Sequence, residues 1–158
     1  MRNEPSVLKA RVGNREQARP KNRAATSQAI SIPVESDLDI VSARQKGREL
    51  ATDMGFSSSD ATLIATAISE LARNIILYAK RGHIILKVAV QSNTPGIVIA
   101  ACDEGPGISD IRRALQDGYS TSRSLGLGLP GVRRLMDEFE IVSEVNRGTR
   151  VTVTKWKR

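Results

Sequence analysis

Hydrophobic and polar residues recur along this chain with two different periods, and the periods predict its strands and helices. Ile30, Ile32 and Val34 alternate with polar residues, which is the two-residue period of a strand. Apolar residues from Ile64 to Tyr78 instead recur three and four positions apart, which is the period of a helix with one apolar stripe. The chain therefore combines strands with helices that bury one side.

The same patterns and the turn residues between them predict the order β-α-α-β-β-α-loop-α-β-β. The predicted helices cover residues 37–54, 60–79, 109–116 and 129–137. The predicted strands begin near Ile30 and cover residues 83–91, 96–102, 139–145 and 149–156, with Pro95–Gly96 as the turn between the second and third. Adjacent strands with short turns and segregated helices favour an α+β fold. We expect a two-layer sandwich: a mixed, mostly antiparallel sheet with helices on one face.

Composition and charge change this picture at the N-terminus. The chain has 158 residues and a formal charge of +7, of which residues 1–28 carry +5. These residues lack an apolar period, so we expect a disordered basic arm over residues 1–28 and one folded domain over residues 29–158. The domain itself is nearly balanced, with 17 basic and 15 acidic residues, which argues against specific nucleic-acid binding.

Cysteine content and apolar run length exclude several other classes of protein. Cys102 is the one cysteine, which excludes an intrachain disulfide and a cysteine-rich metal site. No apolar run approaches the about 20 residues of a membrane span, and the N-terminus lacks the apolar stretch of a secretory signal. We therefore expect no membrane contact and a cytoplasmic location.

Glu70 and Asn74 form the first candidate site. They are four residues apart on the second predicted helix, so they lie on one face, at the rim of the apolar stripe. A carboxylate and an amide oxygen suit Mg²⁺ that is held jointly with substrate phosphates. The carboxylate could instead accept a proton from an attacking hydroxyl. A pair of ordinary surface residues is the alternative interpretation.

Three further segments are candidates for binding a nucleotide. Asp103–Gly107 (DEGPG) follows an apolar strand at its carboxyl end, where Asp103 could accept the exocyclic amine of a purine. Gly126–Gly131 (GLGLPG) precedes a helix, whose N-terminal N–H groups and dipole favour phosphate. Gly148–Thr149 opens the last strand. Each segment can also be a plain turn, and no Walker loop is present. The glycine run follows a long Ser/Thr-rich loop and not a strand, so we do not expect a Rossmann site.

Taken together and in this order, the four motifs resemble the GHKL superfamily of ATPases and kinases. In that superfamily Glu-x-x-x-Asn, Asp-x-Gly-x-Gly, a Gly-x-Gly lid and a Gly-Thr pair surround one ATP. The sequence is more specifically similar to the stressosome switch kinases of the RsbT type, which are related to the anti-sigma-factor kinases. The segments that carry this similarity are Ile68–Ile75, Asp117–Ser122, Leu127–Val132 and Arg134–Phe139.

The resemblance implies the GHKL (Bergerat) ATP-binding fold and a role for each matching residue. Glu70 would be the general base, and Asn74 would bind Mg²⁺ through the ATP phosphates. Asp103 would bind adenine, and Thr149 would lie near the base. The other implied ATP-binding residues are Gly105, Gly107, Arg123, Gly126, Leu127, Gly128, Leu129 and Gly131.

The resemblance also implies a reaction and partners. We expect an ATP- and Mg²⁺-dependent serine/threonine protein kinase that phosphorylates STAS-domain scaffold or antagonist proteins of a stressosome-type complex. It would switch to a second partner, a downstream regulator such as a phosphatase or other output protein, and a homodimer stays open. The alternatives are an anti-sigma-factor kinase and a nucleotide-dependent partner-binding module with little catalysis. The resemblance leaves the role of the basic arm open.

Overall fold

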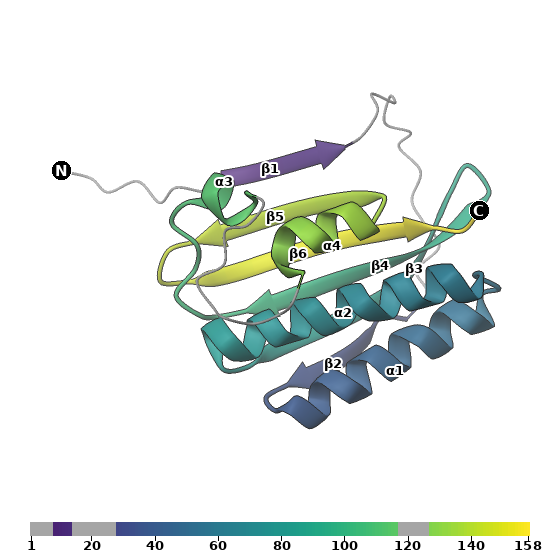
Figure 1. Cartoon of the computed structure of the whole chain (residues 1–158), viewed down its shortest axis with the longest axis horizontal. Helices are drawn as coiled ribbons and strands as arrows, with labels where there is room; N and C mark the ends of the chain where they lie inside the picture. The colour runs from purple at the N-terminus through teal and green to yellow at the C-terminus, as the bar shows by residue number, and fades with distance from the viewer. Residues whose placement is uncertain (1–7, 14–27, 117–126) are drawn as a thin grey trace.

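The computed structural model describes residues 8–13, 28–116 and 127–158, which form one sheet with helices packed on it (Figure 1). The strands are β1 (Leu8–Gly13), β2 (Ile30–Val34), β3 (Gly82–Gln91), β4 (Thr94–Asp103), β5 (Glu138–Glu144) and β6 (Gly148–Trp156). The helices are α1 (Asp37–Asp53), α2 (Ser58–Ala79), α3 (Ile111–Ala114) and α4 (Gly128–Leu135). Figure 1 shows α1, α2 and α4 on one face of the sheet. The predicted two-layer α+β sandwich is confirmed.

The six-stranded sheet has the order β1-β5-β6-β4-β3-β2. Each described pair of neighbours is antiparallel, so the prediction of a mixed sheet is wrong in that respect. The reason is that α1 and α2 run in opposite directions and return the chain to the end at which β2 finished. β3 then leaves antiparallel to β2, and β3–β4 and β5–β6 are hairpins.

Helix α2 lies over the middle of the sheet and supplies the core (Figure 1). Its N-terminus is capped by the Ser57 hydroxyl, which accepts from the Asp60 amide at 3.1 Å. Its apolar stripe, Ile64, Ile68, Leu71 and Ile75, is at most 2% exposed. Among the described residues it alone is long and apolar enough to cross a bilayer, and its packing in the core accounts for that apolar character.

Small residues let the other helices approach α2 closely. A Cβ atom on Gly47 of α1 would lie 2.0 Å from the Ile68 Cδ1 atom, so a larger residue at this helix crossing would force the Ile68 side chain to move. On the other side α4 packs against α2, and its Val132 is fully buried. The Cα trace of the three helices is therefore fixed by contact with one central element.

The turn between β3 and β4 is Ser92–Asn93 and not Pro95–Gly96, which corrects the prediction. Ser92 and Asn93 have φ values of +50° and +62°, as a two-residue hairpin turn requires. Pro95 and Gly96 belong to β4. Gly96 is needed there because the ring of Trp156 covers it: a Cβ atom would lie 2.4 Å from Trp156 Cε3. The glycine that suggested a turn makes room for an aromatic ring.

The structure differs from the predicted disordered arm over residues 1–28 in one segment, residues 8–13, which form β1. Residues 8–13 pair antiparallel with β5, with Arg11 opposite Glu140 in register. Leu8, Ala10 and Val12 have the two-residue period of a strand, and the pairing covers what would be an open sheet edge. The arm's other residues, 1–7 and 14–27, lie outside the described part, and the division at residue 28 stays a prediction.

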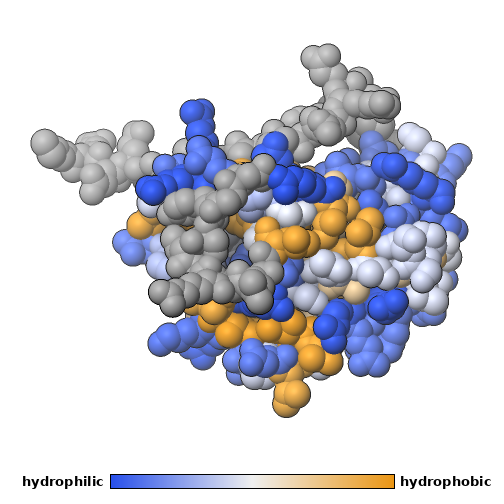
Figure 2. Space-filling model, in the orientation of Figure 1, coloured by the Kyte–Doolittle hydropathy of each residue, from blue (hydrophilic) through white to orange (hydrophobic). Residues whose placement is uncertain are grey.

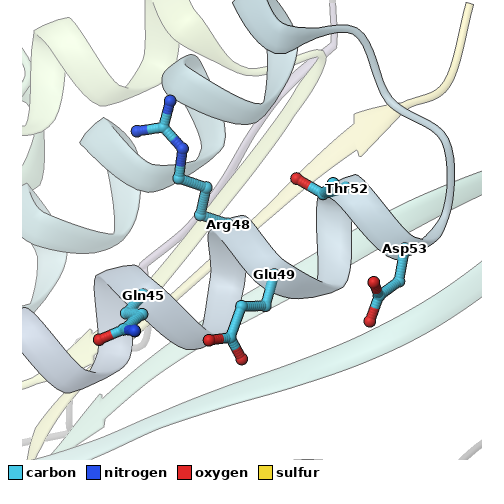
Figure 3. A pocket seen from close by; sticks show the side chains of 5 residues that line it. All are labelled: Gln45, Arg48, Glu49, Thr52 and Asp53. Carbon is cyan, nitrogen blue, oxygen red and sulfur yellow. The ribbon is translucent and has the colours of Figure 1, made fainter.

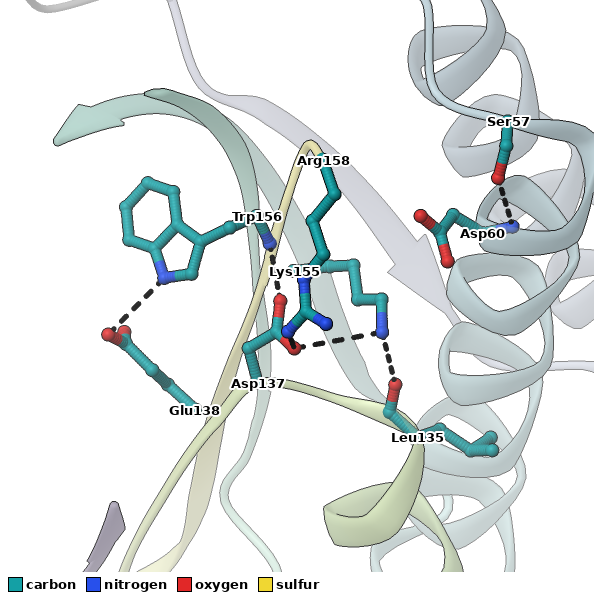
Figure 4. Close-up of polar contacts among 8 residues, drawn as sticks. All are labelled: Ser57, Asp60, Leu135, Asp137, Glu138, Lys155, Trp156 and Arg158. Carbon is teal, nitrogen blue, oxygen red and sulfur yellow. Dashed lines mark hydrogen bonds and ion pairs between the residues drawn. The ribbon is translucent and has the colours of Figure 1, made fainter. Parts of the chain in front are cut away.

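Charged side chains connect the C-terminal ends of α4 and the chain (Figure 4). Lys155 is 8% exposed, and its Nζ donates to the Leu135 carbonyl at 3.0 Å and lies 3.8 Å from Asp137 Oδ1. Asp137 also accepts from the Trp156 amide at 2.8 Å and from Arg158 at 2.9 Å. A buried ammonium thus occupies the negative end of the α4 dipole and fixes that end of the helix.

Lys155→Met tests this anchor. The substitution keeps most of the unbranched side chain but removes the donor to Leu135, so we expect a loss of about 1–2 kcal/mol in the free energy of unfolding. Lys87→Met, at an exposed position on β3, is the matched control. Urea denaturation of both variants measures the effect, and equal losses would contradict the anchor.

Removal of residues 1–28 tests the contribution of β1. β1 lies at the edge of the sheet and pairs with one strand, β5. We expect the melting temperature to fall by no more than about 5 °C, with more self-association through the uncovered β5 edge. Calorimetry and light scattering measure the two quantities. A drop beyond about 15 °C would mean that the removed residues are part of the core.

Candidate functional site

Glu70 and Asn74 lie one turn apart on α2, as the spacing predicts. Glu70 is 8% exposed, which is deeper than the rim position expected from the sequence, while Asn74 is half-buried. The Glu70 carboxylate is held by Arg73, whose Nη1 lies 2.8 Å from Oε1. Glu70 is therefore a buried carboxylate in a charge-assisted hydrogen bond. The sequence reading did not identify Arg73, although it immediately precedes Asn74.

The Asp103–Gly107 turn begins where β4 ends and packs against the last turn of α2. Asp103 Oδ1 accepts from the Gly105 amide at 2.9 Å, which shapes the turn. A Cβ atom on Gly105 would lie 2.6 Å from the Cβ atom of Ala79, the last residue of α2. This packing places the turn at the same end of the molecule as the C-terminal half of the helix that carries Asn74.

The turn also contacts the hairpin between β5 and β6. Gly107 has φ +75°, and a Cβ atom there would lie 2.3 Å from the Glu144 carbonyl oxygen. A Cβ atom on Gly148 would lie 2.0 Å from the Asp103 carbonyl oxygen. Both positions require glycine because another backbone segment of the protein itself, and not a ligand, lies too close for a Cβ atom. The turn is held rigidly before any ligand arrives.

Thr149 lies opposite Asp103 in the β4–β6 register, so the structure brings these two predicted residues together. Ser143 links them to the neighbouring loop: its hydroxyl accepts from the Ile108 amide at 2.8 Å and lies 2.8 Å from Thr149 Oγ1. Ser143 is 2% exposed and the sequence reading missed it. The available signal was a small polar residue in phase with the buried Phe139 and Ile141 of β5.

The N-terminus of α4 forms the described part of the glycine-rich lid. Gly128 is the first helical residue, with φ +63°, and Leu127 before it is 51% exposed. Pro130 has no N–H, and the Gly131 amide donates to the Leu127 carbonyl at 3.2 Å. Within the helix the amides of Gly128 and Leu129 therefore have no acceptor. A Cβ atom on Gly131 would lie 2.3 Å from that of Leu127. Arg123 and Gly126 lie outside the described residues, so their roles stay predictions.

The donor set fits Mg²⁺ only when phosphates complete it. No group of three or more His, Cys, Asp or Glu side chains that could hold a metal occurs in the described ranges. The Asn74 amide oxygen can supply one ligand, and Mg²⁺ commonly binds through one or two protein oxygens together with substrate phosphates and water. The residues present therefore suit a nucleotide-bound metal ion and not a metal held by the protein alone.

Cys102 lies next to Asp103 on β4, on the sheet face away from the helices. Burial raises the pKa of its thiol; the Arg150 charge opposes this rise and the Asp103 charge adds to it. A thiol with a raised pKa is protonated at neutral pH and is a poor nucleophile. Cys102 is half-buried, so it is less enclosed than a core residue but still inert by this criterion.

An open hollow of 340 Å³ lies along α1 (Figure 3). Its lining consists of Gln45, Arg48, Glu49, Thr52 and Asp53. All five residues come from a single helix, and none is a residue that the sequence motifs identify. The hollow therefore supplies convenient positions for control substitutions away from the candidate site.

Comparison with known proteins agrees with this arrangement. The sequence matches the histidine kinase-like ATPase domain family over residues 33–155. It is 50% identical to the serine/threonine-protein kinase RsbT of Bacillus subtilis (strain 168) over 127 residues, which cover 80% of this chain and 96% of that protein. It is 36% identical to an anti-sigma F factor of Thermoanaerobacter sp. (strain X514) over 99 residues, or 59% of this chain and 68% of that protein.

A solved structure shows the same fold. The crystal structure of the RsbU and RsbW domains of Rv1364c from Mycobacterium tuberculosis matches with a TM-score of 0.55 and 20% identity, covering 85% of this chain and 34% of that chain. At this identity the likeness concerns the fold alone. Together with the sequence matches it confirms the GHKL resemblance. The chain belongs to the histidine kinase-like ATPase domain family, in which RsbT is a relative that it matches over almost that protein's whole length.

Proposed function

We propose that the protein is an ATP-dependent serine/threonine protein kinase whose acceptors are STAS-domain proteins of a stressosome-type complex. The observation that carries the proposal is a buried carboxylate, Glu70, one turn before the Asn74 amide on the helix that faces the Asp103–Gly107 turn. The 50% identity to a protein named as a serine/threonine kinase supports the same reaction. We further propose that a downstream regulator, such as a phosphatase, is the second partner.

In this proposal the nucleotide lies across the end of the sheet where β4 finishes and β6 starts. Asp103 and Thr149, which are opposite each other in register, bind the adenine. The amides of Gly128 and Leu129 at the N-terminus of α4 donate to the phosphates. Asn74 provides an oxygen to Mg²⁺, which when bound neutralises the charge on the phosphate oxygens. In phosphoryl transfer the protein's own residues mainly position the nucleotide and stabilise its charge.

Glu70 accepts the proton of the attacking serine or threonine hydroxyl. A base for this step needs an oxygen within hydrogen-bond reach of the acceptor and little competition from water. At 10% exposure the Glu70 side chain has restricted access to water. Arg73 donates to Oε1, and in this proposal Oε2 is the oxygen that meets the acceptor hydroxyl.

The surface at this end of the molecule suits a protein acceptor. Figure 2 shows apolar residues gathered on the helix face where α1 begins and α2 ends. Leu38 (78% exposed) and Val41 (45%) lie in the first turns of α1, and Leu77 (49%) lies in the last turn of α2. A contiguous apolar patch on a soluble surface commonly marks a site of protein contact. An apolar patch supports a folded domain as acceptor over a small molecule.

A second candidate function is nucleotide-dependent partner binding with little catalysis, as in an anti-sigma factor. The 36% identity to an anti-sigma F factor favours keeping it. The two functions differ in whether phosphate leaves ATP. Purified protein, radiolabelled ATP and a STAS-domain protein recovered by pull-down decide between them. The kinase proposal predicts label on a serine or threonine of that protein; tight ATP-dependent binding without transfer would favour the alternative.

Glu70→Gln tests the base. We expect phosphoryl transfer to fall by about 100-fold or more, because the amide cannot accept the proton, while ATP affinity stays within about threefold. The amide still accepts from Arg73, so the fold should persist. Glu49→Gln, at an exposed position on α1, is the matched control and should transfer normally. Full activity of Glu70→Gln would exclude Glu70 as the base.

Asn74→Ala tests the metal ligand. Loss of the amide oxygen should weaken Mg²⁺–ATP binding by about tenfold or more, with a smaller effect on ATP in the presence of EDTA. Gln45→Ala removes a comparable amide from the exposed side of α1 and should change neither affinity. Calorimetric titrations measure both. Equal loss with and without Mg²⁺ would place Asn74 outside the metal site.

A further inference from the structure

We propose that Arg73 is a positioning residue for phosphoryl transfer: it holds the Glu70 carboxylate in the one orientation that lets its second oxygen reach the acceptor hydroxyl. This inference rests on the proposed kinase function. It assigns a task to a residue that lies between the two motif positions and that the motif itself does not include. Arg73 acts on the reaction through Glu70 and does not contact the acceptor.

The geometry supports this task. Arg73 Nη1 lies 2.8 Å from Glu70 Oε1, a charge-assisted hydrogen-bond distance. The hydrogen bond from Arg73 is to Oε1 of the Glu70 carboxylate. A single fixed bond removes rotation about the carboxylate while leaving Oε2 for a second partner. A free Glu side chain would have to lose that rotational freedom at each turnover.

The environment distinguishes this pair from an ordinary surface pair. Arg147 and Glu144 have the same three-residue separation, but their atoms are 3.4 Å apart and their side chains are 78% and 28% exposed. Solvent screens such a pair and leaves it with little effect. The Glu70 side chain is 10% exposed, while Arg73 is 39% exposed and extends toward solvent. The buried partner is therefore the one whose orientation is fixed.

Packing in the core fixes where Glu70 and Arg73 lie around the axis of α2. Leu71, between the two residues, is 1% exposed and Ile75 is 2% exposed, so α2 cannot rotate about its axis. With the helix locked, a three-residue separation puts Arg73 about 300° around the axis from Glu70 and one turn along, which is adjacent to it. The helix thus places the guanidinium beside the carboxylate without any contribution from a ligand.

A double-mutant cycle in the transfer assay tests the inference. We expect Arg73→Met to lower kcat by about 10-fold or more with the KM for ATP within about twofold, and Arg73→Lys to restore part of kcat. In a Glu70→Gln background Arg73→Met should have no further effect, because the carboxylate base that Arg73 orients is already absent. Arg48→Met on α1 is the control for loss of an exposed arginine.

Each outcome decides the inference. If Arg73→Met lowers kcat by the same factor in the Glu70→Gln background as in the unmodified protein, the inference is overturned. Arg73 would then act independently of Glu70, for example on phosphate. A raised KM for ATP with unchanged kcat would overturn it in the same way. If Arg73→Met does not fold by circular dichroism, Arg73→Ala, which likewise cannot donate to Glu70, replaces it in the cycle. Absence of transfer by the unmodified protein would instead refute the proposed function.

Discussion

The packing of one face of α2 on the sheet is the constraint on which the rest of the structure depends. Ile64, Ile68, Leu71 and Ile75 bury that face almost completely, and each fully buried side chain of this kind contributes roughly 1.5–3 kcal/mol. α1 packs against the helix on one side and α4 on the other. Because the helix cannot turn, the direction of every polar residue beside its stripe is fixed as well.

The polar chemistry is arranged around that fixed helix. Glu70 and Asn74 project from its C-terminal half, and the Asp103–Gly107 turn packs against its last residue. The turn is held from the other side by the β5–β6 hairpin, through contacts that exclude any Cβ atom at Gly107 and Gly148. The glycines of the motif therefore build a rigid site edge in addition to whatever they contribute to a ligand. Preorganisation of this kind lowers the cost of binding.

Local patterns predicted the elements that depend on local physics. The periods at Ile30–Val34 and Ile64–Tyr78 identified β2 and α2 because burial of one side imposes them on sequence. The patterns failed where a residue far along the chain determines the local structure. Gly96 was read as a turn residue, but it lies under the ring of Trp156, 60 residues away. β1 was missed because its strand period is short and its partner, β5, is far along the chain. Arg73 was missed because its role depends on the burial of Glu70, which the sequence pattern does not reveal.

The central claim is that this end of the sheet binds Mg²⁺–ATP, and a crystal structure with a non-hydrolysable ATP analogue and Mg²⁺ tests it most directly. The account predicts adenine beside Asp103 and Thr149, phosphates at the amides of Gly128 and Leu129, and Mg²⁺ within bonding distance of the Asn74 amide oxygen. Analogue bound elsewhere, for example in the hollow on α1, or metal without any contact to Asn74, would contradict it.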